Sequence, residues 1–597
     1  MKFLKKNRKE VREFLIFKDQ LNNMKQIVIN TKTANLWSHE AAVRKKIKAM
    51  TIMQGENIKG YGQVYEEYRE LLDNISIRLL DDYNIKNNTD FVFDEIVREN
   101  LDDYVKSGIM TVLVTSHIPK ILADDFDRYI PDNPKDDYLK ARGIKRVVYL
   151  HLGETNTGKT YEAIERLKMS NNGIYLAPLR ILALEIFEKL NESGVTCDLL
   201  TGEEEIIMEG AKHQSCTVEK LNIDKEYKVA VIDEIQMLGD NQRGAAWTRA
   251  LLGLRCPEIH VCGALNAKEL LQEILESCED DYEVKEYVRN VPLQIEEKPF
   301  ELKEVKDGDA IIVFSKKRVL EIAKIFMDNK IATSMIYGDL PPEVRKIQYR
   351  DFVEGRNKIL VSTDAIGMGV NLPIRRIIFM NSKKFDGDEI RTLTSQEIKQ
   401  IAGRAGRKGI YEIGYVASTG EQYEFIKRNI EKKDDPLIEA VVGPSEVLLK
   451  IKGLPLRDKL ALWATREEKV PIYKKMDIRD YIFILDKIKR YKLEEAVEWR
   501  LMRLPFDVHN ERVFVAFIDY VEQYFIRKKE AIYKPVEDGQ SLEDLEIYYQ
   551  KINLYYSFAK NFNLPFEEEW VYDERTDVSE RINLLLIKGR FSECRSR

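Results

Sequence analysis

The sequence has few cysteines and no long apolar run. Its 597 residues include six cysteines, and none of them forms a Cys-x-x-Cys pair, so a disulfide framework is excluded and a reducing compartment is favoured. Cys256, His260 and Cys262 lie close together in an apolar stretch, where buried structural thiols are a better interpretation than a metal site. Because no run of ~18 apolar residues occurs, we expect no transmembrane helix and no membrane partner.

An excess of positive charge is also lacking. Lys and Arg number 95 and Asp and Glu number 101, which gives a net charge of −6. Histone-like neutralisation of a nucleic acid is therefore excluded, whereas a local basic groove is not. The first residues are basic, but Glu10, Glu13 and Asp19 interrupt them. Neither a secretory signal nor an acid-poor mitochondrial transit peptide fits this pattern, so we expect a bacterial-type cytoplasmic protein rather than one of the mitochondrial matrix.

Two series of apolar runs indicate two α/β domains in the middle of the chain. Short apolar runs alternate with helical segments from Lys145 onward, which is typical of parallel sheets. The first series consists of Val147–Leu152, Ile174–Ala177, Val229–Ile232 and Ile259–Gly263. The second consists of Ala310–Phe314, Ile359–Ser362 and Ile377–Met380. A polar stretch near Val291–Asp309 separates them, so we place a domain junction there.

Helical spacing fills both flanks of these domains. The segments Tyr481–Leu501 and Glu511–Lys528 have apolar residues three and four positions apart, which predicts helices. The predicted domains are 1–138 (helical), 139–297 (α/β), 298–425 (α/β) and 426–597 (helical). One group of aromatic residues near the C-terminus permits base stacking, but core packing of an amphipathic helix is the preferred interpretation. Its members are Tyr548, Tyr549, Tyr555, Tyr556 and Phe558.

The first apolar run leads into a phosphate-binding pattern. The loop consists of Gly153, Glu154, Thr155, Asn156, Thr157, Gly158, Lys159 and Thr160. This is the G-x-x-x-x-G-K-T pattern, in which backbone N–H groups wrap the phosphates, Lys159 reaches the β and γ phosphates, and the Thr160 hydroxyl binds Mg²⁺. A predicted helix over Lys159–Lys168 directs its positive end at the bound anion. The loop therefore predicts an ATP and Mg²⁺ site.

An acidic pair follows the third run of the first series. Asp233 and Glu234 come directly after Val229–Ile232, so their carboxylates are expected at the edge of the sheet beside the phosphate loop. Asp233 would hold Mg²⁺, and Glu234 would orient and deprotonate the attacking water. The alternative is a surface acidic pair with no such role.

Two arginines lie close together after the second series. The segment Gln400–Arg407 contains Arg404 and Arg407 three positions apart, with small residues between them. Across a cleft, these side chains could stabilise the transition state at the γ-phosphate as arginine fingers. The alternative is an ordinary basic helix, which the small residues Ala402, Gly403, Ala405 and Gly406 disfavour because they permit close approach to another surface.

Taken in order, these segments resemble the motifs of superfamily two helicases. The set comprises Gly153–Thr160, Ala177–Arg180, Thr201–Glu204, Cys216–Glu219, Asp233–Gln236, Ser362–Asn371 and Gln400–Arg407. Further segments resemble the helicase of the mitochondrial RNA degradosome and its bacterial relatives, over roughly residues 140–420. They are Tyr175–Arg180, Arg243–Leu254, His260–Gly263 and Tyr337–Pro342. One departure is Ile401, where many superfamily members carry Arg.

The resemblance implies a fold and an activity. It implies two tandem RecA-like parallel-sheet domains flanked by mostly helical N- and C-terminal domains. It also implies ATP-dependent translocation, 3′ to 5′, on single-stranded and partially duplex RNA, with unwinding, in RNA turnover and with an exoribonuclease partner.

The resemblance further implies residue roles. Gln236 would sense ATP and couple the domains, and Gln400 would contact the γ-phosphate or its water. Asp364 and Gly369 would lie near the nucleotide across the cleft. The residues expected to touch the nucleic-acid backbone are Pro178, Arg180, Gly202, Thr217 and Thr363.

Three other functions remain as alternatives. A DNA-directed helicase or translocase is the first, because contacts to the nucleic-acid backbone do not clearly distinguish RNA from DNA by the 2′-hydroxyl. A non-catalytic nucleotide-gated RNA clamp is the second, although Lys159, Glu234 and both arginines are present. A P-loop metabolite kinase is the third, and it leaves the segments after Ser362 without an explanation.

Overall fold

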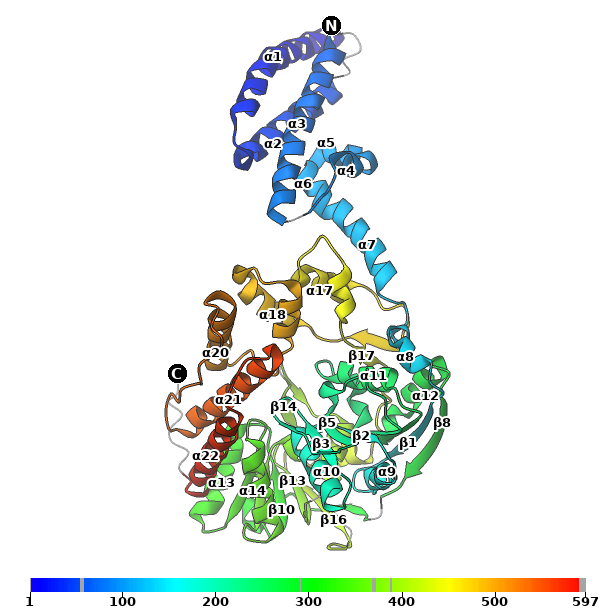
Figure 1. The fold of residues 1–597 in the computed structure, drawn as a ribbon, viewed down its shortest axis with the longest axis vertical. Helices are drawn as coiled ribbons and strands as arrows, with labels where there is room; N and C mark the ends of the chain where they lie inside the picture. The colour runs from blue at the N-terminus through cyan, green and yellow to red at the C-terminus, as the bar shows by residue number, and fades with distance from the viewer. Residues whose placement is uncertain are drawn as a thin grey trace. The chain divides into compact units, whose positions relative to one another are not determined.

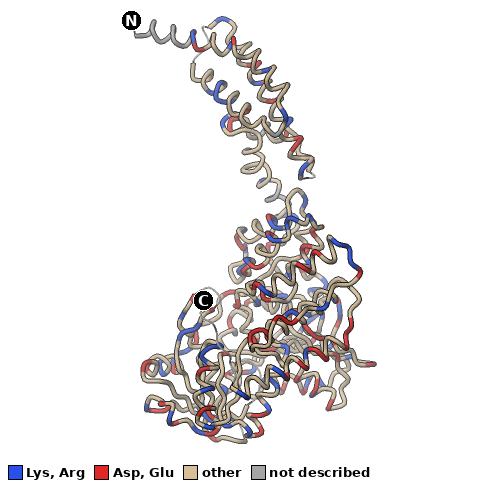
Figure 2. Tube along the Cα trace, turned by 90° about the vertical axis from the view of Figure 1, so that its left-hand side faces the viewer, with Lys and Arg blue, Asp and Glu red and all other residues tan. Residues whose placement is uncertain are grey.

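The chain forms two compact units in the computed structural model. The structure describes residues 2–53, 58–87, 89–289, 291–367, 372–386, 389–407 and 409–589. One unit comprises Met1–Pro131 with Glu446–Lys459, and the other comprises Asp132–Ser445 with Leu460–Arg597. Figure 2 shows basic and acidic residues intermingled along both units. No helix of the described residues is long and apolar enough to cross a membrane.

The N-terminal segment of the first unit is helical (Figure 1). Its helices are α1 (Lys2–Asn30), α2 (Leu36–Ile52), α3 (Tyr61–Asn87), α4 (Phe93–Glu99), α5 (Leu101–Ser107), α6 (Ile109–Val112) and α7 (Ile118–Tyr129). Val43, Ile47, Leu72 and Ile75 recur at helical spacing and are buried, so α2 and α3 pack through one apolar stripe each.

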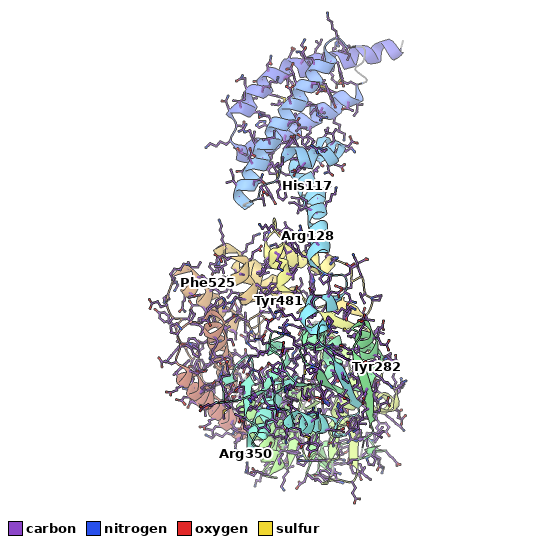
Figure 3. The ribbon with its side chains drawn as sticks, turned by 45° about the vertical axis from the view of Figure 1, so that its right-hand side comes forward. His117, Arg128, Tyr282, Arg350, Tyr481 and Phe525 are labelled. Atoms are coloured by element: carbon purple, nitrogen blue, oxygen red, sulfur yellow. The ribbon has the colours of Figure 1, made fainter. Side chains whose placement is uncertain are left out.

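The first sheet of the second unit has eight strands in the order β4-β3-β5-β2-β6-β7-β1-β8. The strands are β1 (Val147–Gly153), β2 (Gly173–Ala177), β3 (Cys197–Leu200), β4 (Glu205–Ile206), β5 (His213–Thr217), β6 (Val229–Ile232), β7 (Glu258–Gly263) and β8 (Asp281–Tyr287). All neighbours pair in parallel except β3 and β4. Tyr282, labelled in Figure 3, lies on the edge strand β8. The carboxyl ends of β1, β2, β5 and β6 therefore share one edge of the sheet.

Helices cover this sheet and complete its core. They are α8 (Leu139–Arg142), α9 (Lys159–Lys168), α10 (Arg180–Glu192), α11 (Gly244–Gly253) and α12 (Lys268–Ser277). Trp247 of α11 is fully buried, and its indole N–H donates to the Asp233 carbonyl oxygen at 2.9 Å. The core thus fixes the backbone at the end of β6.

The second sheet has six strands in the order β11-β12-β10-β13-β16-β9. The strands are β9 (Leu293–Ile295), β10 (Asp309–Ile312), β11 (Thr333–Ile336), β12 (Ile359–Ser362), β13 (Arg376–Phe379) and β16 (Gly414–Ser418). Its helices are α13 (Lys316–Asp328), α14 (Pro342–Val353), α15 (Ser395–Ala402) and α16 (Tyr423–Glu431), and β14 (Lys383–Phe385) pairs with β15 (Ile390–Thr392) as an antiparallel ribbon. All pairs within the six-stranded sheet are parallel.

The remaining elements are mostly helical. They are β17 (Ala440–Val442), α17 (Leu456–Thr465), β18 (Tyr473–Lys475), α18 (Arg479–Ile488), α19 (Glu495–Met502), α20 (Glu511–Val521), α21 (Leu542–Phe562) and α22 (Glu568–Ile587). The helical spacing over Tyr481–Leu501 is confirmed and belongs to two helices, since Lys492 adopts a left-handed conformation with φ +49° between α18 and α19. The aromatic residues of α21 are buried, so the prediction of core packing is confirmed.

Two parallel-sheet domains between helical flanks confirm the predicted fold class. In Figure 1 the two sheets lie within one unit, and α22 lies beside α14. The domain limits at residues 138, 297 and 425 stay predictions. The structure groups Glu446–Lys459 with the N-terminal helices, although the sequence pattern assigned it to the C-terminal part.

Candidate nucleotide and nucleic-acid site

The phosphate-binding pattern forms the turn between β1 and α9. Asn156 and Gly158 both have positive φ, +64° and +87°, and this bends the chain sharply ahead of the first helical residue. The Lys159 ammonium group donates to the Glu154 carbonyl oxygen at 2.9 Å. The loop thus curls around Lys159, which is the first residue of α9. A loop that surrounds the N-terminus of a helix in this way has the geometry that binds phosphate.

Asp233 lies beside this loop at the end of β6. Its Oδ1 accepts a hydrogen bond from the Thr160 hydroxyl at 3.2 Å, and its Oδ2 accepts one from the Tyr175 hydroxyl at 2.9 Å. Burial and the neighbouring Glu234 carboxylate raise the pKa of Asp233 to about 6. A hydroxyl and a carboxylate oxygen held together are the hard ligands that suit Mg²⁺, with phosphate oxygens and water completing its shell.

Glu234 has a strained backbone with φ +52°. Positive φ is uncommon for a residue with a long side chain. The Gln236 side-chain N–H donates to the Glu234 carboxylate. The side-chain oxygen of Gln236 accepts a hydrogen bond from the Ala264 N–H at 3.0 Å. Gly263 permits this approach, because a Cβ there would lie 2.7 Å from the Gln236 oxygen. The carboxylate of Glu234 is therefore fixed in the cleft through Gln236.

The second domain presents α15 and the turn after it to the loop. The Arg404 guanidinium donates to the Gly367 carbonyl oxygen at 2.5 and 3.1 Å and lies 3.9 Å from the Glu234 carboxylate. Gly403 lies against the loop, since a Cβ on it would fall 1.6 Å from the Thr155 hydroxyl oxygen. The structure thus brings Arg404 to the predicted catalytic carboxylate.

Other residues of the same turn complete this contact. The Asn156 amide donates to the Gly406 carbonyl oxygen at 2.9 Å. Gln400 and the half-buried Arg407 come from the same segment, and Gln400 packs near Gly367.

A cleft of about 890 Å³ opens between the two domains at this point. Its size is within the range of small-molecule sites. Predicted site residues that line it are Gly153, Glu154, Thr155, Lys159, Glu234, Gln236 and Gln400. Side chains of both domains therefore face one space.

Asp364 lies next to a cluster of charges in the second domain. The Lys384 ammonium group pairs with the Asp364 carboxylate at 3.0 Å and with Glu397 at 2.7 Å. Although burial opposes it, hydrogen bonds from Arg391 and Lys384 hold the pKa of Glu397 at about 2. Asp364 is thus engaged by a lysine beside α15, and Gly369 lies outside the described residues.

Three of the predicted nucleic-acid contacts lie at or just after the carboxyl ends of strands. Thr217 pairs with Ala177 at the end of β5, and Pro178 follows β2. The Pro178 carbonyl oxygen accepts from Arg243 at 2.6 Å. Thr363 follows β12 in the second sheet, and its hydroxyl accepts from the Ala365 N–H at 3.3 Å. Backbone and hydroxyl groups at such ends suit contacts to phosphate and sugar.

Arg180 has a different setting from the one expected. Its guanidinium donates to Glu203 at 2.6 Å, Glu204 at 3.1 Å and Glu343 at 2.9 Å, and also to the Tyr549 hydroxyl at 3.1 Å. Although burial alone lowers it, these groups raise the pKa of Arg180 well above its ordinary value. The side chain is engaged by acidic groups, so the structure does not bring it to an open phosphate-binding surface.

Gly202 is covered by the C-terminal region. Its carbonyl oxygen accepts from the Ser557 hydroxyl at 3.0 Å, and Pro505 lies 3.4 Å from the position of a Cβ. The Glu203 carbonyl oxygen accepts from Arg575 at 2.6 Å. This loop therefore serves as a docking surface for α21 and α22 in the structure.

Sequence reasoning missed two side chains that organise the site. Tyr175 orients Asp233 from the interior of β2, and its polar hydroxyl in a buried strand was the available signal. Arg289 lies on the cleft between β8 and β9, outside every motif. The described residues contain no group of three or more His, Cys, Asp or Glu side chains that could hold a metal ion by themselves.

Sequence profiles match three parts of the chain. The DEXQ-box helicase domain of Suv3 matches residues 134–287, the helicase conserved C-terminal domain matches 295–409, and the ATP-dependent RNA helicase SUV3 C-terminal domain matches 542–588. The mitochondrial ATP-dependent RNA helicase SUV3 of Oryza sativa subsp. japonica is 37% identical over 72% of this chain and 78% of its own length. The chain belongs to the SUV3 helicase family.

Two relatives from Arabidopsis thaliana, both named mitochondrial DExH-box ATP-dependent RNA helicases, show the same relationship. DExH18 is 33% identical over 75% of this chain and 60% of its own length. DExH16 is 43% identical over 55% of this chain and 57% of its own length. The chain thus spans a little under two thirds of these two relatives.

The expectation of a bacterial-type cytoplasmic protein is wrong. The SUV3-family relatives are named as mitochondrial proteins, which contradicts that expectation. The prediction depended on Glu10, Glu13 and Asp19, and these acidic residues do not identify the compartment in which the protein works.

Proposed function

We propose that this chain is an ATP-dependent RNA helicase. ATP binds between the two parallel-sheet domains, and its hydrolysis drives 3′ to 5′ movement on single-stranded RNA and the unwinding of duplexes. The observation that carries the proposal is the position of Glu234 and Arg404, which come from different domains and lie 3.9 Å apart beside a cleft that Glu234 lines. The names of the SUV3-family relatives support RNA as the substrate.

The predicted site residues divide the work of hydrolysis between them. Lys159 and the loop N–H groups hold the phosphates. Glu234, fixed by Gln236, accepts a proton from the attacking water. Arg404 and Arg407 stabilise the charge that develops on the γ-phosphate, and Gln400 orients the water or the phosphate.

Thr160 and Asp233 would hold Mg²⁺. Their oxygens are 3.2 Å apart, and the Tyr175 hydroxyl keeps the carboxylate in place. The bound ion would neutralise phosphate charge. The carboxylate of Asp233 must be ionised for this, and a dication favours that form despite the raised pKa.

Hydrolysis changes how tightly the domains hold the nucleotide and each other. Pro178 and Thr217 lie in the first parallel-sheet domain and Thr363 lies in the second. An RNA strand that contacts all three through its backbone is therefore bound by both domains. When the two domains approach and separate, the contacts of one domain move along the strand relative to those of the other. Contacts of this kind carry affinity without reading sequence.

Unwinding of tailed RNA duplexes tests the proposal. Matched duplexes with a 3′ tail, a 5′ tail or blunt ends are incubated with the chain, with and without ATP and Mg²⁺. We expect ATP-dependent strand separation of the 3′-tailed duplex alone. Separation without ATP, or preference for the 5′ tail, would contradict the proposed motor or its polarity.

An exoribonuclease partner is part of the same proposal and depends on the family resemblance. It would degrade the strand that the helicase releases. Co-purification after nuclease treatment, followed by mass spectrometry, tests it. Recovery of an exoribonuclease in fixed ratio is expected, and its absence from a preparation that retains helicase activity would contradict it.

A further inference from the structure

Arg289 lies in the connection between the two parallel sheets. It follows β8, the edge strand of the first sheet, and precedes β9, the edge strand of the second. Its guanidinium donates to the carbonyl oxygen of Gly403 at 2.7 Å and to that of Ala405. The same group is 3.4 Å from the Thr155 carbonyl oxygen of the phosphate loop.

These acceptors flank one residue. Gly403 and Ala405 stand directly before and after Arg404, so the planar guanidinium grips the backbone on both sides of the arginine that faces Glu234. Arg289 also donates to the Val291 carbonyl oxygen at 2.5 Å, which fixes its own segment. A guanidinium can make such a forked set of bonds, whereas an ammonium group acts as a point charge.

Main-chain carbonyl groups are the acceptors that Arg289 has in the described part of the chain. Burial lowers its pKa, the Glu154 carboxylate opposes this shift, and the positive charge of Arg404 adds to it. Burying a cation is costly, so the hydrogen bonds to main-chain carbonyl groups account for the position of Arg289 better than surface solvation does.

We propose that Arg289 is a positioning residue that sets the orientation of Arg404 for ATP hydrolysis. It ties the turn of the second domain to the phosphate loop of the first through the connection between them. A change in the distance between the domains is thereby transmitted to the backbone of Arg404. This inference rests on the proposed function, since Arg404 has this task only in an ATP-hydrolysing enzyme.

A double-mutant cycle tests it. Steady-state ATPase with saturating RNA is measured for Arg289→Ala, Arg289→Lys, Arg404→Ala and the Arg289→Ala/Arg404→Ala pair. We expect kcat to fall by ~10²-fold for Arg289→Ala, the scale of a small misplacement in a catalytic site, with KM for ATP near its starting value. Arg289→Lys should not restore kcat, and the pair should be no slower than Arg404→Ala alone. Multiplicative losses, or a normal kcat in Arg289→Ala, would overturn the proposal.

A measurement that needs no hydrolysis separates this proposal from the function. Hydrogen exchange of the 403–406 amides is compared in the full chain, in Arg289→Ala and in the control Arg318→Ala, which removes an exposed arginine of α13. We expect several-fold faster exchange in Arg289→Ala and no change in the control. Unchanged exchange in Arg289→Ala overturns the proposal, whereas a native chain that hydrolyses no ATP overturns the proposed function instead.

Discussion

The Arg404 guanidinium and the Glu234 carboxylate lie 3.9 Å apart across the cleft between two domains. One is the proposed transition-state cation, and the other is the proposed base. The opposite charges of these two groups attract each other, so each holds the other beside the phosphate loop. In the proposed mechanism both groups act at the γ-phosphate and its attacking water.

Removal of the loop lysine should abolish hydrolysis. Lys159→Ala takes away the cation that neutralises the β and γ phosphates, so we expect no measurable ATP turnover and weaker ATP binding. A phosphate-release assay and a fluorescent-nucleotide titration measure the two effects. Lys168→Ala, at the far end of the same helix, is the control and should behave like the native chain; normal turnover in Lys159→Ala would refute the assignment.

Removal of the base should separate binding from turnover. Glu234→Gln keeps the size of the side chain but cannot accept the proton of water, so ATP should bind and turnover should be lost. Glu283→Gln, an exposed position on β8, serves as the matched control. Native-like kcat in Glu234→Gln would assign the base to another residue.

Arg407 should matter for turnover more than for binding. An arginine finger can contribute ~10³-fold or more to the rate, so Arg407→Ala should retain ATP affinity and lose most of its kcat. Equilibrium nucleotide binding and single-turnover hydrolysis measure the two separately. Turnover close to that of the native chain would remove Arg407 from the mechanism and leave Arg404 as the single finger.

Arg180 should stabilise the fold. Arg180→Ala leaves Glu203, Glu204 and Glu343 close together without their cation, and removing one member of a buried ion-pair network costs about 3 kcal/mol or more. We expect a lower free energy of unfolding, measured by urea denaturation with intrinsic fluorescence. Arg356→Ala, an exposed arginine paired with Asp351, is the control. A stable Arg180→Ala variant with reduced RNA affinity would instead support the contact to nucleic acid that the sequence resemblance implies.

Two stacked histidines behind the phosphate loop should make stability depend on pH. His151 Nε2 and His260 Nδ1 are 2.8 Å apart, and His151 Nδ1 is 2.7 Å from the Tyr287 hydroxyl. Burial, with the neighbouring His260 adding to it, lowers the pKa of His151 to about 4, and burial also lowers the pKa of His260. Glu162, Lys285, Glu258 and Arg166 are the charged groups that act on this pair.

The unfolded chain binds protons to these histidines at a higher pH than the folded chain does. Their contribution to stability is thus complete above pH ~6.5 and is lost as the pH falls towards 4, with a slope of up to ~1.4 kcal/mol per pH unit for each group. Denaturation curves of His151→Gln at several pH values should show a shallower loss. His509→Gln, an exposed histidine, should keep the native slope, and an unchanged slope in His151→Gln would contradict the argument.

The sequence predicted the parts of the fold that carry continuous apolar runs. The strand Val229–Ile232 and the helix Lys159–Lys168 have the predicted bounds, because four buried apolar residues and a glycine-lysine helix start are strong local signals. The strand Asp281–Tyr287 has charged residues at alternate positions, since it forms the edge of its sheet. The strand His213–Thr217 is buried but polar, so hydropathy could not identify it.

The sequence predicted the residues of the candidate site that belong to a recognisable motif. It did not predict the residues whose role depends on contacts with distant parts of the chain. The loop, the acidic pair and Arg404 follow from spacing and order along the chain. The partners of Arg180 come from α14 and α21 as well as from its own domain, and no local pattern reports such distant neighbours. The same holds for Arg289, since Thr155, Gly403 and Ala405 lie more than a hundred residues from it along the chain.

The central claim is that ATP hydrolysis in this cleft is coupled to RNA. Steady-state ATPase without nucleic acid, with single-stranded RNA and with matched single-stranded DNA, each beside Lys159→Ala, tests it most directly. We predict stimulation by RNA well above that by DNA and none in Lys159→Ala. Equal stimulation or a preference for DNA would contradict the RNA assignment, and absence of hydrolysis under every condition would contradict the enzyme itself.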